Sequence, residues 1–206
     1  MPSEPVWACD KKVIWIMRTL FRFCVFAAGF AFVTSSAVAQ QRVHALTGTV
    51  TSINSKIRMV EVETDDGSPG HFEFVKAGTS LQFDKNVSAD TTAAEKFSTD
   101  KAHVIVYYVG QGEIRTAVAF LPLGEGPLKT TKGTVVKFNR HDHLVTIKND
   151  AGVEETFALD AKTVADTETG VTPGSKADFG KGKVVRVTAL QGNGTNTAVL
   201  IANVLW

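Results

Sequence analysis

The chain contains two similar segments, the second lying 85 positions after the first. Over the 25 positions from Gly48 to Phe72, eight residues are identical at this offset. Average residue usage would give roughly one or two such identities by chance, so the pattern predicts one folding unit present twice. The identical pairs are Gly48/Gly133, Thr49/Thr134, Val50/Val135, Asn54/Asn139, Val60/Val145, Asp65/Asp150, Gly67/Gly152 and Phe72/Phe157.

Residues 1–39 have the layout of a secretory signal peptide. Basic residues precede an uncharged apolar run of 11 residues, Phe23 to Val33, which is shorter than the roughly 20 residues of a membrane-spanning helix. The segment ends in Ala37-Val38-Ala39, the small-residue pattern of a signal-peptidase site. We therefore predict cleavage between Ala39 and Gln40 and a periplasmic or secreted protein that does not span the membrane. The sequence leaves open whether translation starts at Met1 or at Met17.

The predicted mature chain contains no cysteine, because Cys9 and Cys24 both lie in the leader. Disulfides, thiolate metal sites and cysteine nucleophiles are therefore excluded from it. Its 18 basic and 19 acidic residues are nearly balanced, and such a balance gives no attraction to a polyanion. We expect no nucleic-acid partner.

Five short strands are predicted in each copy from β-branched residues and from polar–apolar alternation. They cover 49–53, 59–64, 71–75, 104–109 and 116–121 in the first copy, and 134–138, 144–148, 155–159, 184–189 and 197–202 in the second. A partly helical connection after the third strand is predicted from the capping-box spacing of Thr92 and Glu95 and from Thr172-Pro173. Phe97 and Phe179 are expected to end these helices inside the core.

This order of elements predicts an all-β protein with minor helix, made of two tandem small five-stranded OB-like β-barrel domains. An SH3-like roll and a two-sheet sandwich are the alternatives. The predicted boundaries are 1–39 for the signal peptide, 44–122 for the first barrel repeat, 123–130 for the linker and 131–206 for the second barrel repeat.

Glycines at matching positions predict matching backbone features. Gly67 and Gly152 fall in Asp-x-Gly turns between the second and third strands, where a tight turn needs a positive φ. Gly48 and Gly133 open the first strands, where we expect a bulge or a close approach of two backbones.

The Gly-Thr-Val openings, the Asp-x-Gly turns and the late segment from Asp178 to Val187 are together similar to exported bacterial domains of unknown function. The resemblance covers both copies, about 155 residues. The first copy departs from it at 98–103, where both glycines of the late segment are missing. The resemblance implies a small OB-like β-barrel and an exported location, and it implies no activity.

The densest group of candidate metal ligands is His141-Asp142-His143, in the turn between the first two strands of the second copy. Two imidazoles and a carboxylate could bind a divalent metal if a third element supplied another ligand. The first copy has Lys56-Ile57-Arg58 at these positions, so the fold itself does not require metal. A solvated polar turn is the simpler interpretation.

The sequence contains no G-x-S-x-G or H-E-x-x-H motif, and we predict no catalytic residue and no cofactor. The main hypothesis is an exported, non-enzymatic tandem β-barrel binding module for an unknown envelope ligand or protein partner. One alternative is a periplasmic divalent-metal-binding protein that uses His141 and His143. The other is a small outer-membrane β-barrel, suggested by the terminal aromatic residue Trp206. Oligomeric state and the relative orientation of the repeats stay open.

Overall fold

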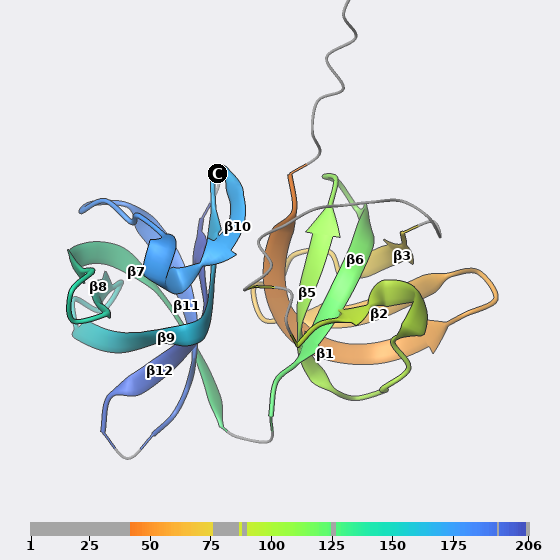
Figure 1. The fold of residues 1–206 in the computed structure, drawn as a ribbon, viewed down its shortest axis with the longest axis horizontal. Coiled ribbons are helices and arrows are strands. Elements are labelled where there is room, and N and C mark those ends of the chain that lie inside the picture. Colours follow the sequence, from red (N-terminus) through yellow and green to blue (C-terminus); the bar gives the residue numbers. More distant parts are fainter. Residues whose placement is uncertain (1–41, 76–86, 88–89, 125–126, 193, 205–206) are drawn as a thin grey trace, which may run out of the picture. The chain divides into compact units, whose positions relative to one another are not determined.

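The computed structural model describes residues 42–75, 87, 90–124, 127–192 and 194–204. The predicted signal peptide, its cleavage site and Trp206 lie outside the described residues, as does part of the predicted linker. Among the described residues, no helix is long and apolar enough to cross a bilayer. The described strands form two six-stranded sheets (Figure 1), so the all-β prediction is confirmed.

The first sheet contains a closed ring of five strands. These are β1 (His44–Asn54), β2 (Met59–Thr64), β3 (His71–Phe74), β5 (His103–Val109) and β6 (Ile114–Pro122). The ring runs β3-β2-β1-β5-β6 and closes through the parallel pair of β3 with β6, while the two-residue β4 (Thr92–Ala93) is added to β6. All other pairs in it are antiparallel, which is the arrangement of a small Greek-key barrel of the OB type.

The second sheet repeats the pairing of the five-stranded ring, while its sixth strand pairs with β9. Its strands are β7 (Leu128–Asn139), β8 (Leu144–Asn149), β9 (Glu154–Thr167), β10 (Gly170–Pro173), β11 (Val184–Leu190) and β12 (Asn196–Asn203). The ring β8-β9-β12-β11-β7 closes through β7 and β8, and β9 and β12 form its parallel pair. β7 begins inside the predicted linker, and β9 continues eight residues beyond the predicted strand.

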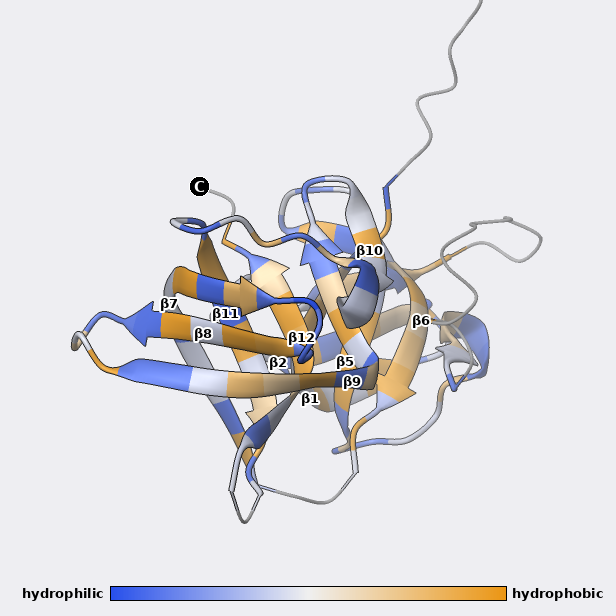
Figure 2. Ribbon diagram, turned by 60° about the vertical axis from the view of Figure 1, so that its left-hand side comes forward, coloured by the Kyte–Doolittle hydropathy of each residue, from blue (hydrophilic) through white to orange (hydrophobic). Residues whose placement is uncertain are grey.

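Polar and apolar residues alternate along the strands, as the colours of Figure 2 show, and the buried apolar side chains form one core cluster in each barrel. Phe72 and Phe157 are completely buried at equivalent positions of the two cores, and Phe97 and Phe179 are buried as predicted. Each interior is therefore a packed hydrophobic core.

In the described part of the connections after the third strands, Val87 is helical, and each connection holds a 3-10 turn, η1 (Ala94–Lys96) and η2 (Gly174–Lys176). Neither turn has a side-chain cap. Thr92 lies in β4 and Thr172 in β10, so both threonines pair with neighbouring strands. Strand pairing satisfies backbone groups that a helix of only three residues leaves open, which is why the capping interpretation was wrong.

The glycine predictions hold for both turns and both close approaches. Gly67 and Gly152 have φ values of 71° and 81°. A Cβ atom on Gly48 would lie 2.5 Å from the carbonyl oxygen of Glu63, and one on Gly133 would lie 2.6 Å from that of Lys148. In the first copy Lys101 adopts the positive φ that Gly182 supplies in the second, at 60° against 88°, which explains how the fold tolerates the missing glycine.

Replacing Gly133 with alanine is expected to lower the free energy of unfolding by about 1–3 kcal/mol, because the new Cβ would force β7 and β8 apart. Chemical denaturation measures this loss. Gly180→Ala is the matched control, since a Cβ atom on Gly180 would meet no heavy atom within 4 Å beyond its chain neighbours. Equal stabilities of the two variants would contradict the close-approach explanation.

Candidate functional site

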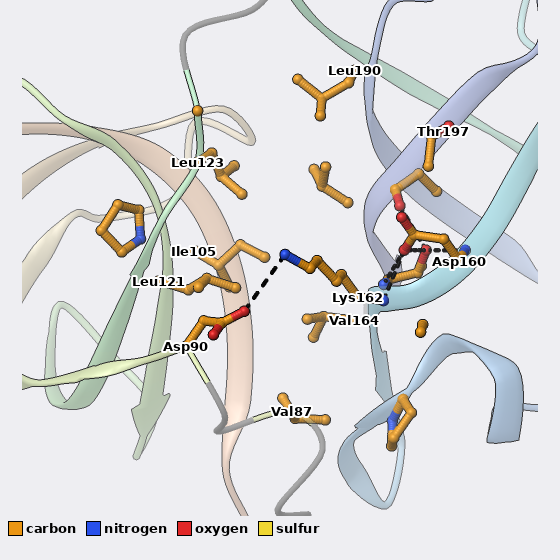
Figure 3. Close-up of a pocket in the computed structure, with 17 residues that line it drawn as sticks. Val87, Asp90, Ile105, Leu121, Leu123, Asp160, Lys162, Val164, Leu190 and Thr197 are labelled. Atoms are coloured by element: carbon orange, nitrogen blue, oxygen red, sulfur yellow. Dashed lines mark hydrogen bonds and ion pairs between the residues drawn. The ribbon is translucent and has the colours of Figure 1, made fainter.

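A pocket of about 500 Å³ lies between walls contributed by the two barrels (Figure 3). This volume is within the range of sites that hold small organic ligands. The barrels belong to one compact unit, Gln40–Trp206. The lining is Val87, Asp90, Ile105, Leu121, Pro122, Leu123 and Gly124 on one side, and Asp160, Ala161, Lys162, Thr163, Val164, Pro173, Leu190, Thr197, Ala198 and Val199 on the other.

The first wall uses the outward face of two strands of the first barrel. Val104 and Val106 of β5 point into that barrel's core, so Ile105 and Tyr107, which alternate with them along the strand, point out of it. Both are nonetheless buried, at 1% and 0% exposure. Val87 of the first copy and Val164 and Leu200 of the second barrel pack with them in one apolar cluster, and so cover an outer face that strand alternation alone would leave exposed.

The second wall is built by an irregularity of β9. Leu159 pairs with Ala198 of β12, and Val164 pairs with Leu200, so the intervening β9 residues 160–163 face a single β12 residue. Such a bulge redirects side chains away from the regular ladder. Here it brings Asp160 and Lys162 to the pocket.

Hydrogen bonds fix the shape of this bulge. The Asp160 Oδ1 atom accepts bonds from the backbone N–H groups of Lys162 and Thr163, both at 2.8 Å. The Thr163 hydroxyl donates to the Ala198 carbonyl oxygen at 2.7 Å and accepts from the Asp160 N–H at 2.8 Å. The pocket wall is therefore organised without a ligand.

Three of the lining residues are charged: Asp90, Asp160 and Lys162. The Lys162 Nζ atom lies 3.7 Å from an oxygen of Asp90, and the two side chains are 83% and 65% exposed. In Figure 3 the Lys162 side chain extends from the bulge toward Asp90 on the opposite wall. The site thus combines an apolar surface with a small group of charges at its edge.

Polar contacts fix the barrels against each other beside the pocket. Asp166 on β9 accepts a hydrogen bond from the backbone N–H of Ala45 and pairs with His44 Nδ1, both at 3.0 Å. Arg186 on β11 pairs with Asp66 at 3.1 Å. Burial alone would raise the pKa of Asp66, but hydrogen bonds from Ser68 and the charge of Arg186 lower it overall.

An apolar cluster accompanies these polar contacts. It joins Val43, Ala45, Ile105, Tyr107 and Ala119 of the first barrel to Val164 and Leu200 of the second. Because Ile105 and Val164 also line the pocket, docking of the barrels and formation of the pocket depend on the same surfaces.

The hydrogen bond to Asp166 raises the pKa of His44 above its usual 6.5, outweighing the opposing effects of burial and of Arg42. The Tyr108 ring also faces the imidazole, at 6.0 Å between centroids. The pKa of His44 is therefore higher in the folded protein than in the unfolded chain. The stability contributed by the His44–Asp166 pair is complete at pH values below the unfolded pKa, and it is lost as pH rises through the folded pKa.

We therefore expect the unfolding free energy to decrease as pH rises above about 6.5, and to decrease less in a His44→Gln variant. Denaturation at a series of pH values measures both profiles. The exposed His141→Gln variant should keep the wild-type profile. A His44→Gln profile identical to the wild-type profile would contradict the assignment.

The structure places the candidate metal ligands His141 and His143 in the exposed turn between β7 and β8. Asn139 shapes this turn: its side-chain oxygen accepts from the N–H groups of His141 and Asp142, and its amide donates to the Asp142 carboxylate. His143 takes a positive φ of 54°. Among the described residues, no group of three or more His, Cys, Asp or Glu side chains is placed to hold a metal ion.

Asn54 has the same role in the first copy, accepting from the N–H groups of Lys56 and Ile57. The shared asparagine is therefore explained by turn geometry.

Sequence reasoning did not identify Asp160, Lys162 or Asp166 as site residues. The available signal was Asp160-Ala161-Lys162-Thr163, an aspartate followed three residues later by threonine, which is typical of a side-chain-stabilised turn.

No protein-family model matches this chain, and no curated protein matches it. Among solved structures, the crystal structure of Ag(I)CusF is similar at 14% sequence identity, with a TM-score of 0.30. The match covers 37% of this chain and 97% of that one. A likeness at this level carries no information about the ligand or activity of the present protein.

Proposed function

We propose that this protein is an exported, non-enzymatic binding protein that holds a small, largely apolar ligand between its two β-barrels. The observation that carries the proposal is the pocket of about 500 Å³, with an apolar lining from both barrels. Apolar walls with a few placed polar groups are the usual composition of small-molecule sites. The export part of the proposal rests on the leader pattern at residues 1–39 and predicts a mature N-terminus at Gln40, which mass spectrometry of the exported protein tests.

A ligand screen by thermal shift tests the binding proposal. A ligand at 100 times its Kd adds about 2.7 kcal/mol to the stability of the folded protein. We expect at least one amphipathic compound in a library of small envelope molecules to give such a shift. The protein expressed from its full-length sequence is the sample.

Two tryptophan variants show whether the shift comes from this pocket. Ala161 is exposed and lines the pocket, so Ala161→Trp fills the site with little effect on the fold. Ala151 is an exposed residue of the β8–β9 turn outside the lining, so Ala151→Trp is the control. The shift should disappear only in Ala161→Trp. A uniformly flat screen, or equal shifts in both variants, would overturn the proposal.

The two alternatives from the sequence, a divalent-metal-binding protein that uses His141 and His143 and a small outer-membrane β-barrel, stay predictions.

A further inference from the structure

We propose that the ligand is a cationic amphiphile, with an apolar body that fills the pocket and a protonated amine that binds Asp90 and Asp160. This inference rests on the proposed function and adds the chemical class of the ligand.

The charges of the lining favour a cation. Two carboxylates and one ammonium give the described lining a formal charge of −1. The carboxylates come from opposite sides, with Asp90 preceding β4 in the first barrel and Asp160 in the β9 bulge of the second (Figure 3). A ligand carboxylate would meet two like charges and one opposite charge, whereas an amine would meet two opposite charges and one like charge, that of Lys162.

Lys162 already places an ammonium group at this location. Its Nζ atom lies 3.7 Å from Asp90 at the end of an alkyl chain beside the apolar walls. The Lys162 side chain therefore has the same chemical groups as a short alkylamine ligand. Because both partners of the pair are largely exposed, the pair contributes little stability and Lys162 can turn into water when a ligand amine replaces it.

Asp160 is held in position to receive the amine. Its Oδ1 atom accepts bonds from the backbone N–H groups of Lys162 and Thr163. These bonds orient the carboxylate, while the side chain as a whole stays exposed. An oriented carboxylate loses less conformational entropy on binding than a free one.

Three ligands with the same alkyl chain separate charge from apolar fit: decylammonium, decanoate and decan-1-ol, each below its micellar concentration. Isothermal titration calorimetry at neutral pH measures their affinities. We expect decylammonium to bind most tightly and decanoate most weakly. The preference for decylammonium should shrink with added salt, because salt screens exposed charges.

Charge-removing variants locate the amine. Asp90→Asn and Asp160→Asn should each weaken decylammonium binding about three- to tenfold and leave decan-1-ol binding unchanged. Lys162→Gln should strengthen decylammonium binding, because it removes the competing ammonium. Asp100→Asn, which removes an exposed carboxylate outside the lining, is the matched control and should have no effect.

The outcomes distinguish this inference from the proposed function. Equal binding of all three ligands, abolished by Ala161→Trp, would overturn the cation preference and keep the binding function. Tightest binding of decanoate, lost in Lys162→Gln, would likewise assign an anionic ligand to the same pocket. Failure of all three ligands would overturn the inference, and the wider screen would then decide the function separately.

Discussion

Replacing Asp166 with alanine is expected to lower the free energy of unfolding by about 3 kcal/mol, because one carboxylate satisfies two groups of the other barrel. Asp166 is 8% exposed and Ala45 is 3% exposed. Without the carboxylate, the Ala45 N–H group is left buried without its acceptor, and His44 loses its charged partner. Urea denaturation of the variant and the wild type measures the difference.

A nearby acidic residue provides the control for this change. Glu168 follows β9, is 61% exposed and pairs with Lys183 on the surface. Glu168→Ala should leave the unfolding free energy almost unchanged, because exposed ion pairs contribute little to stability. Because Asp166 holds together the barrels that form the pocket, Asp166→Ala should also weaken ligand binding while Glu168→Ala leaves it intact. Equal losses of stability in the two variants would contradict the role given to Asp166.

The second large effect is expected at the two equivalent core phenylalanines. Phe157→Ala should cost about 3–5 kcal/mol, the usual loss for a buried phenylalanine. Phe72→Ala should cost about 1–2 kcal/mol more, because the Arg115 guanidinium carbon lies 4.6 Å from the centroid of the Phe72 ring. Denaturation of both variants gives the comparison.

Arg115 is buried against aromatic rings. It is 7% exposed, its Nε atom has no hydrogen-bond partner among the described residues, and a terminal nitrogen donates to the Ser68 hydroxyl at 3.5 Å. The Arg115 guanidinium carbon also lies 4.5 Å from the centroid of the Tyr108 ring. A double-mutant cycle with Arg115→Met isolates the pairwise energy. A coupling energy near zero would show that the ring contributes only its volume.

The sequence predicted the elements of the fold well because their signals are local. Alternation of polar and apolar residues depends on the two-residue period of a strand, and positive-φ glycines depend on turn sterics. β2 begins and ends at the predicted residues. The helix-capping roles of Thr92 and Thr172 were predicted incorrectly, since these residues pair with β6 and β9, and that pairing leaves no local signal in the sequence.

The candidate site was harder to predict because its residues act only in combination. Asp160 and Lys162 belong to a bulge whose presence depends on the register between β9 and β12. Asp90 and Lys162 form an ion pair although they are 72 residues apart in the sequence. No local periodicity or motif in the sequence indicates such a contact. The cluster that local reasoning did select, His141 with His143, lies in an exposed turn away from the pocket lining.

By itself, the sequence determined that two similar β units follow one another, where their tight turns fall and which side chains fill each core. Those properties follow from backbone sterics and hydrophobic patterning within short segments. Only the tertiary structure decided what covers the outer face of β5, where Tyr107 is fully buried, and that a pocket forms there. The physical reason is that packing between two barrels depends on the shape and charge of surfaces that come together only after each barrel has folded.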